Sequence, residues 1–262
     1  MNYYQINKNF TKRNIFKLLS SEEFNLDLFN KKVEEDYLIL SKNYRSEFFY
    51  KNTLFNKLIV GKYGLVTTSA ISELMIKASK ADFVILNRNR GIVYEIKTDL
   101  DNLDRLVYQL IDYSHAFSEL YVVTSEKNYY PVYKVIRESI PSVGIIILTD
   151  KISLSIRKHA EHYDENLDHE TLFKLLRKKE YELLLYNKYR KLPDVTPVKY
   201  FKECLMWFKK IDLVEAQSLV FNQLKNRNLF KDINLLKKLP ISTRWLIYSG
   251  NFDFEILSKI HK

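Results

Sequence analysis

The fold is decided by residues 79–113, which read SKADFVILNRNRGIVYEIKTDLDNLDRLVYQLIDY. This stretch holds two apolar runs, Phe83–Leu86 and Ile92–Ile96, and a polar turn between them that ends in Gly91. Two short apolar runs joined by such a turn predict a β-hairpin, in which the glycine is available for a position with positive φ. We expect the rest of the chain to be organised around this hairpin.

Three charged residues interrupt these otherwise apolar strands: Asp82, Glu95 and Lys97. Successive side chains of a strand alternate between faces, so Glu95 and Lys97 point the same way, while Tyr94 and Ile96 face the other side. Burying a charge is unfavourable unless the charge is paired or binds a metal. One interpretation is a buried salt bridge beside a solvated Asp82. The interpretation that we favour is a functional site.

The pattern resembles the PD-(D/E)xK nuclease superfamily, whose hairpin carries an Asp on one strand and (Asp/Glu)-x-Lys on the next. Asp82 and the run Glu95-Ile96-Lys97 match that hairpin, with Ala81 in the place of the superfamily's variable proline. Residues 109–113, QLIDY, match the QxxxY motif of the RecB-like subgroup, on the helix expected after the Lys strand. The resemblance covers about residues 45 to 125.

The resemblance implies an α/β fold of the restriction-endonuclease-like type, a mixed sheet flanked by helices. It also implies hydrolysis of phosphodiester bonds with Mg²⁺ or Mn²⁺. Asp82 and Glu95 would be metal ligands, and Lys97 would orient or deprotonate the attacking water or neutralise the transition state. Gln109 and Tyr113 would complete the set of candidate catalytic residues beside the metal and the nucleic-acid backbone. Mg²⁺ takes oxygen ligands and keeps several waters, so two carboxylates and a backbone carbonyl suffice.

Glu73 is a further candidate metal ligand. It lies in the middle of Ala70–Ile76, which we expect to form the first strand. Its spacing to Asp82 looks like that of superfamily members in which a Glu-containing strand precedes an Ala-Asp strand. Glu73 would then hold or orient a metal. The alternative is an ion pair with Lys77 or Lys80 at the surface, and the sequence leaves both interpretations open.

Glu47 is a weaker candidate for the same metal site. It lies in the first turn of the helix predicted for Tyr44–Val60, which Gly61 is expected to end. Superfamily members often place a Glu that orients the metal on the helix before the first core strand. An acidic residue in a first helical turn is also stabilised by the helix dipole alone. That second interpretation is the one we prefer for Glu47.

The helix after the hairpin supplies a candidate substrate contact. Asp101 is its expected N-cap, with Asp104 three residues on in a pattern close to a capping box. Arg105, Gln109 and Tyr113 follow at a spacing of four residues, so they form one line along the helix. Arg105 would contact a phosphate on this line. In the alternative interpretation, Tyr113 packs into the core and Gln109 lies at its rim.

The segments after this helix predict a buried sheet and then only helices. Glu119–Thr124 and Val143–Thr149 are expected strands, with a helix around Tyr130–Ser139 that makes a parallel crossover between them. Ile152–Ile156 is an expected edge strand. From His169 onward all signals are helical. We therefore predict three parts, which are an N-terminal helical cover (1–42), a nuclease core (43–168) and a C-terminal helical subdomain (169–262).

The composition of the chain indicates which kind of partner it binds and which classes of protein can be excluded. Hydrophobic residues make up 46% of the 262 residues, and the net charge of +10 favours a polyanion, although a generally basic proteome also explains it. Cys204 is the only cysteine, which excludes a disulfide within the chain and a cysteine-ligated iron–sulfur cluster. No signal peptide is visible, and no apolar run approaches the ~20 residues of a membrane span. We expect a cytoplasmic protein without a membrane partner.

The function predicted from the sequence is metal-dependent nuclease activity, with DNA favoured over RNA as the substrate but the choice between them left open. The resemblance gives phage defence, recombination or mobile-element biology as its setting. The alternative is a non-catalytic module, on a nuclease-like fold, that binds nucleic acid or another protein. A protein partner would then bind through the C-terminal helices. The sequence does not indicate an oligomeric state.

Overall fold

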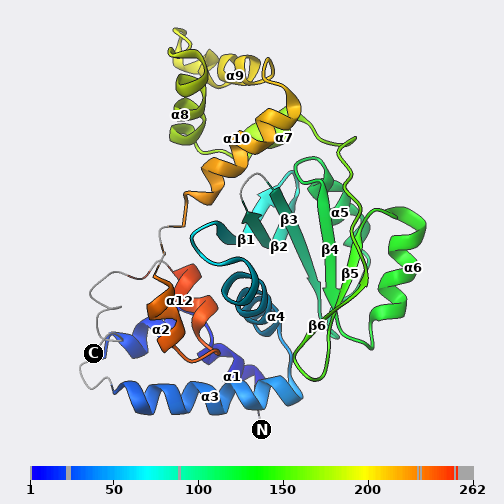
Figure 1. The fold of residues 1–262 in the computed structure, drawn as a ribbon, viewed down its shortest axis with the longest axis vertical. Coiled ribbons are helices and arrows are strands. Elements are labelled where there is room, and N and C mark those ends of the chain that lie inside the picture. The colour runs from blue at the N-terminus through cyan, green and yellow to red at the C-terminus, as the bar shows by residue number, and fades with distance from the viewer. Residues whose placement is uncertain are drawn as a thin grey trace.

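A six-stranded sheet runs through the centre of the computed structural model, which describes residues 2–21, 25–87, 90–228, 230, 232–250 and 252 (Figure 1). The strands follow one another across the sheet in chain order. They are β1 (Thr68–Ile76), β2 (Ser79–Asn87), β3 (Arg90–Lys97), β4 (Glu119–Thr124), β5 (Gly144–Leu148) and β6 (Leu154–Lys158). Strands β3, β4 and β5 pair in parallel, and the other neighbours pair antiparallel. The sheet is therefore mixed and the class is α/β, as predicted.

Two helices connect the parallel strands. Helix α5 (Leu106–Ser114) joins β3 to β4, and α6 (Tyr129–Ser139) joins β4 to β5, which confirms the predicted parallel crossover. The edge strand begins at Leu154 and not at Ile152 as predicted. Ile152 has a φ of 56° and its N–H donates to the Thr149 carbonyl, so it belongs to the turn before β6.

Each face of the sheet has its own core. All residues of β4 and β5 are buried, which explains their nearly continuous apolar sequences. On one face, strand residues such as Val84 and Val122 pack with α5 and α6. On the other face, residues such as Phe83 and Val123 pack with α4 (Glu47–Leu54). Figure 1 shows these helices on opposite sides of the sheet.

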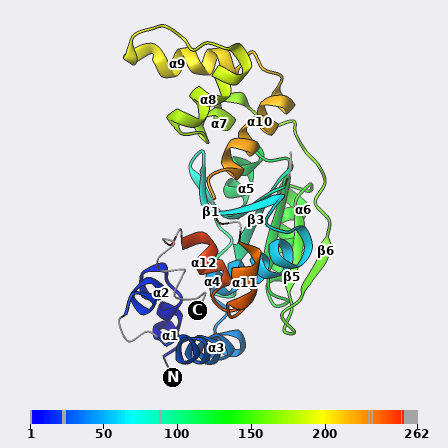
Figure 2. The same ribbon diagram turned by 60° about the vertical axis from the view of Figure 1, so that its left-hand side comes forward.

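The remaining helices gather at two ends of the molecule (Figures 1 and 2). One end holds α7 (His169–Lys174), α8 (Lys178–Tyr189), α9 (Pro197–Phe208) and α10 (Leu213–Lys225). The other end holds α1 (Tyr3–Asn9), α2 (Lys12–Leu19), α3 (Leu26–Asn43), α11 (Ile233–Lys238) and α12 (Arg244–Gly250). None of the helices in the described part of the chain has both the length and the apolar character needed to cross a membrane.

The described residues of the segment predicted as one C-terminal subdomain, 169–262, are thus divided between the two ends. Leu172 and Val220 belong to the core that α5 and α6 share, whereas Leu236 and Ile247 belong to the core of α4 and the N-terminal helices. Both parts are helical, so helical periodicity could not separate them. Which core each apolar stripe joins is decided by tertiary packing.

The helix expected to end at Gly61 continues beyond it. Helix α4 passes into a π-helical segment, η1 (Phe55–Tyr63), and ends at Gly64. The Gly64 N–H donates to the Ile59 carbonyl at 2.7 Å, a bond of the π type. Gly64 has a φ of 81°, a conformation that glycine adopts without steric penalty. The glycine that ends the helix is therefore the second of the two in this segment.

Gly91 permits close packing and does not supply a positive φ, because Gly64 is the glycine with positive φ in the described residues. The turn residues 88 and 89 lie outside the described residues. A Cβ atom added to Gly91 would lie 2.6 Å from the Phe221 ring of α10 and 2.8 Å from the Phe117 ring. Helix α10 can thus pack onto the start of β3 only because position 91 has no side chain.

Candidate active site

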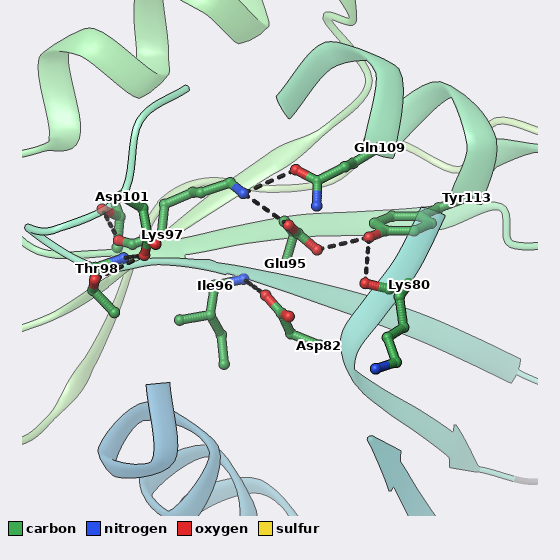
Figure 3. A network of polar contacts seen from close by, with 10 residues as sticks. Lys80, Asp82, Glu95, Ile96, Lys97, Thr98, Asp101, Gln109 and Tyr113 are labelled. Carbon is green, nitrogen blue, oxygen red and sulfur yellow. Dashed lines mark hydrogen bonds and ion pairs between the residues drawn. The ribbon is translucent and has the colours of Figure 1, made fainter. Parts of the chain in front are cut away.

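Strand β3 and helix α5 bring four of the predicted residues into one hydrogen-bonded network (Figure 3). The Lys97 ammonium donates to Glu95 Oε1 at 2.9 Å and to Gln109 Oε1 at 2.9 Å. The Tyr113 hydroxyl lies 2.9 Å from Glu95 Oε2. Glu95 and Lys97 share a face of β3 because they are two residues apart, and Gln109 and Tyr113 share a face of α5 because they are four apart. Glu95 and Lys97 thus point the same way, as their spacing along the strand predicts.

This network is buried, and one N–H of the Lys97 ammonium has no partner within it. Glu95 is 1% exposed and Lys97 is 8% exposed, so their ion pair is largely shielded from water. An ammonium group carries three protons, and Glu95 and Gln109 accept two of those of Lys97. The third proton remains for a water molecule or a phosphate oxygen. Tyr113 has one proton and two neighbours, Glu95 Oε2 and the Lys80 carbonyl oxygen, each at 2.9 Å.

Asp82 lies where the pairing of β2 with β3 stops. The ladder between these strands ends at Phe83 opposite Tyr94, one residue before Asp82 is reached. There the Asp82 carboxylate, and not a backbone carbonyl, accepts the hydrogen bond of the Ile96 N–H at 2.8 Å. The side chain is held at the junction of the two strands, on the same stretch of β3 that carries Glu95.

Glu73 faces Asp82 from β1. Its neighbours pair as Ser72 with Phe83 and Leu74 with Ala81, so the position opposite Asp82 is that of Glu73. Glu73 has a φ of 58°, a left-handed conformation that is uncommon for a residue other than glycine. Backbone conformations of this kind are concentrated at functional sites, which adds to the interest of this position.

Helix α4 adds a third carboxylate to these two. Oxygen atoms of Glu47, Glu73 and Asp82 all lie within 4.8 Å of one another. The sequence favoured a helix-dipole role for Glu47, whereas the structure places it in this acidic group. Glu95, predicted as a metal ligand, lies outside the group and is held by Lys97 and Tyr113.

Lys51 is a residue of this site that sequence reasoning missed. Its ammonium pairs with both Glu47 and Glu73, and its side chain is only 9% exposed. Lys80 also pairs with Glu73, at 2.8 Å, as the alternative interpretation of Glu73 predicted. The spacing of four residues between Glu47 and Lys51 on a helix was the available signal. Two ammonium groups thus balance part of the acidic group's charge.

The carboxyl groups of the site differ in their affinity for a proton. Burial, and then the negative charges of Glu95 and Glu47, raise the pKa of Asp82 to about 8. Burial also raises the pKa of Glu95, against the opposing effect of Lys97. Burial acts to raise the pKa of Glu73 as well, but its hydrogen bonds from Lys51 and Lys80 prevail and lower it. A cation near Asp82 would therefore favour the ionised form of its carboxyl group.

The acidic group fits a hard divalent cation. Mg²⁺ binds oxygen ligands at about 2.0–2.1 Å, so two ligands on opposite sides of the ion are about 4 Å apart. The separations within 4.8 Å among Glu47, Glu73 and Asp82 are close to this span. Three carboxylates also supply the charge and the oxygen atoms that Mg²⁺ and Mn²⁺ prefer.

The start of α5 differs from the prediction. The helix begins at Leu106, and the Asp101 carboxylate accepts hydrogen bonds from the N–H and hydroxyl of Thr98, at 2.8 and 2.7 Å. Asp101 therefore closes the loop after β3 and does not cap the helix. Arg105 occupies the N-cap position, is exposed, and has no side-chain partner among the described residues. Its guanidinium group is not part of the network of Lys97.

Comparison with known proteins identifies a family. A family model described as "Bacteriophage P4 protein cII" matches residues 41–244. No curated protein matches the sequence. A solved structure titled "SPO1766 protein of unknown function from Silicibacter pomeroyi" is similar over 50% of this chain and 86% of its own, with 13% identity and a TM-score of 0.31. A similarity this distant carries no argument about function.

Proposed function

The chain belongs to the bacteriophage P4 protein cII family, and we propose that it is a metal-dependent nuclease that hydrolyses phosphodiester bonds. One observation carries the proposal. A buried ammonium, Lys97, is fixed by Glu95 and Gln109 beside a group of three carboxylates that fits Mg²⁺ or Mn²⁺. The resemblance to PD-(D/E)xK nucleases implies this combination of residue types. The same resemblance supports the proposal that the mixed sheet is a restriction-endonuclease-like core.

In this proposal Asp82, Glu73 and Glu47 would hold the metal ion, whose charge would polarise the scissile phosphate and favour hydroxide. Lys97 uses its third N–H to hold the attacking water or a phosphate oxygen, and its positive charge stabilises the negative charge of the transition state. Glu95 and Gln109 fix the direction of that ammonium. Tyr113 in turn holds Glu95, so the geometry is set before substrate binds.

DNA is the favoured substrate. The net charge of +10 suits a polyanion, and the phosphate backbone dominates the affinity of such proteins. The family's description names a bacteriophage, which suits a setting in mobile-element biology. Phage defence and recombination remain compatible with the same chemistry. Arg105, which is exposed and has no side-chain partner among the residues that the structure describes, is the proposed contact to the backbone of the substrate.

A second candidate function is favoured by the ion pairs of the acidic group. Lys51 lies between Glu47 and Glu73, and Lys80 pairs with Glu73, so much of the negative charge is balanced without a metal. A network of ion pairs that needs no metal fits a protein that binds nucleic acid or another protein without cutting it. The C-terminal helices would then be the surface for a protein partner.

A cleavage assay separates the two functions. Purified protein is incubated with linear, circular and single-stranded DNA, and with RNA, in Mg²⁺, Mn²⁺ or EDTA. We expect cleavage only with metal, and its loss in Lys97→Met. The matched control is Lys134→Met on α6, an exposed lysine without a partner among the described residues, which should cut like the wild type. A folded wild-type protein that binds DNA but cuts no substrate with either metal would support the second function.

A further inference from the structure

A cavity of about 460 Å³ opens at the carboxyl ends of the parallel strands β3, β4 and β5. Its walls come from the end of α3, from α4 and from the loops that follow the three strands. They include Lys42, Tyr44, Tyr50, Asp99, Lys127 and Asp150. In open α/β sheets, ligands bind outside the carboxyl ends of the strands. The volume lies in the range of small-molecule sites, roughly 300–1,000 Å³.

The acidic and the basic side chains that line this cavity differ in whether they already have a partner within the protein. Each carboxylate in its lining already has a partner: Asp99 accepts from the Ser125 hydroxyl, Glu126 pairs with Arg157, and Asp150 pairs with Arg45. Lys42 and Lys127 have no ion pair or hydrogen bond from their ammonium groups within the described residues. Arg45 and Arg157 balance Asp150 and Glu126, which leaves Lys42 and Lys127 against Asp99, whose hydroxyl partner is neutral, so the charge that remains for a ligand is on balance positive.

Tyr50 adds a hydrogen-bond donor to the same cavity. The residue is 1% exposed and lines the cavity, and its hydroxyl has no hydrogen-bond partner in the described part of the chain. The hydroxyl oxygen is accessible from the cavity and can donate to a ligand there. Burial and the negative charge of Asp99 raise its pKa, which keeps the hydroxyl protonated and able to donate.

The start of α6 strengthens the preference for an anion. Residues Ser125 and Lys127 of the cavity lead directly into this helix of 11 residues. Its N-cap residue, Asn128, donates its side-chain amide to the Thr98 carbonyl at 2.9 Å and makes no capping bond. Helix N-termini favour negative charge. In this first turn the Asn128 N–H donates to Ser125 Oγ, the Tyr129 N–H donates to the Glu126 carbonyl and Pro131 has no N–H, so among the described residues the Tyr130 N–H is the one that remains for a ligand.

We propose that this cavity binds a nucleotide of the substrate strand, with its phosphate held by Lys42, Lys127 and the Tyr50 hydroxyl. The aromatic ring of Tyr44 supplies a surface for its base. The inference deepens the proposed nuclease function and rests on it for the identity of the strand. Cavity and active site share two elements: Tyr50 precedes Lys51 on α4, and Asp99 follows Lys97 after β3. A strand with one phosphate at Lys97 can thus place a neighbouring nucleotide in the cavity.

Mononucleotide binding in EDTA tests the cavity independently of cleavage. Thymidine 5′-monophosphate, thymidine and inorganic phosphate are titrated by calorimetry. The monophosphate should bind best, since it alone offers both phosphate and base. Lys42→Gln with Lys127→Gln should weaken its binding on the order of a hundredfold, and Tyr50→Phe on the order of tenfold. The control Lys134→Gln should bind like the wild type. A monophosphate that binds no tighter than thymidine, or equally well to the double variant, overturns the proposal.

Cleavage then identifies the source of the phosphate. If the cavity receives a chain end, linear DNA with a 5′-phosphate should be cut faster than the same DNA with a 5′-hydroxyl, and the double variant should remove that difference. If it receives an internal phosphate, circular DNA should be cut as well, and more slowly by the double variant. Wild-type cleavage of every substrate by the folded double variant contradicts the subsite. The nuclease proposal would survive that result, and it fails on its own if the wild type cuts nothing.

Discussion

Binding of a divalent cation should strengthen as the pH rises toward about 8, because Asp82 must lose its proton to become a ligand. Its pKa of about 8 results first from burial, and then from the charges of Glu95 and Glu47. At one pH unit below this pKa, roughly one Asp82 carboxyl group in ten is ionised. The apparent Kd for Mn²⁺ should therefore fall about tenfold for each pH unit up to about 8, and then level off.

Because the pKa of Asp82 is raised in the folded state, the metal-free protein should become less stable as the pH rises. The pKa of Asp82 in the folded state, about 8, lies above the ordinary value of 3.8, so the folded state holds the proton more tightly. This contribution to stability is complete at a pH below 3.8 and is lost as the pH rises to about 8. Within that window, each pH unit removes up to about 1.4 kcal/mol from the free energy of unfolding.

Two measurements on the wild type and Asp82→Asn check this reasoning. Calorimetric titration with Mn²⁺ gives the apparent Kd, and urea denaturation in EDTA gives the free energy of unfolding, each between about pH 6 and about pH 8. Asparagine is similar in size and cannot ionise, so the variant should bind Mn²⁺ weakly at every pH and lose the extra pH dependence of stability. Other titrating groups cancel in the comparison. Wild-type affinity in Asp82→Asn, or an apparent Kd independent of pH, would refute a ligand role for Asp82.

Three further outcomes are expected. Lys97→Met should slow cleavage by roughly 10²–10⁴-fold while DNA binding stays near the wild-type level. A melting curve must accompany it, since an unpaired Glu95 can lower stability by about 3–5 kcal/mol. Gly91→Ala should destabilise the fold by about 1–3 kcal/mol in urea denaturation, because the new methyl group meets the Phe221 ring, and wild-type stability would contradict that packing. Arg105→Ala should weaken binding to all DNA sequences alike and reduce the slope of log K against log salt by about 0.9, and an unchanged slope would exclude a phosphate contact.

The sequence by itself determined which side chains share a face within one element. Alternation along β3 puts Glu95 and Lys97 together, and a spacing of four residues puts Gln109 and Tyr113 on one face of α5. The fully apolar residues 144–148 predicted a strand buried on both faces, and the structure has it in parallel with β4. These features depend on local periodicity, which can be read from consecutive residues without knowledge of any tertiary contact.

Contacts between distant elements were decided only by the tertiary structure. Glu47 reaches Asp82 because α4 packs on the sheet, and Lys51 comes with it on the same helix. Gly91 looked like a turn residue, yet it is required by the Phe221 ring of α10, far along the chain. Helices α10 and α11 both lie in the segment predicted as one helical subdomain, but they join different cores. Periodicity tells which face of an element is apolar, whereas the partner of that face is set by how all the elements pack together.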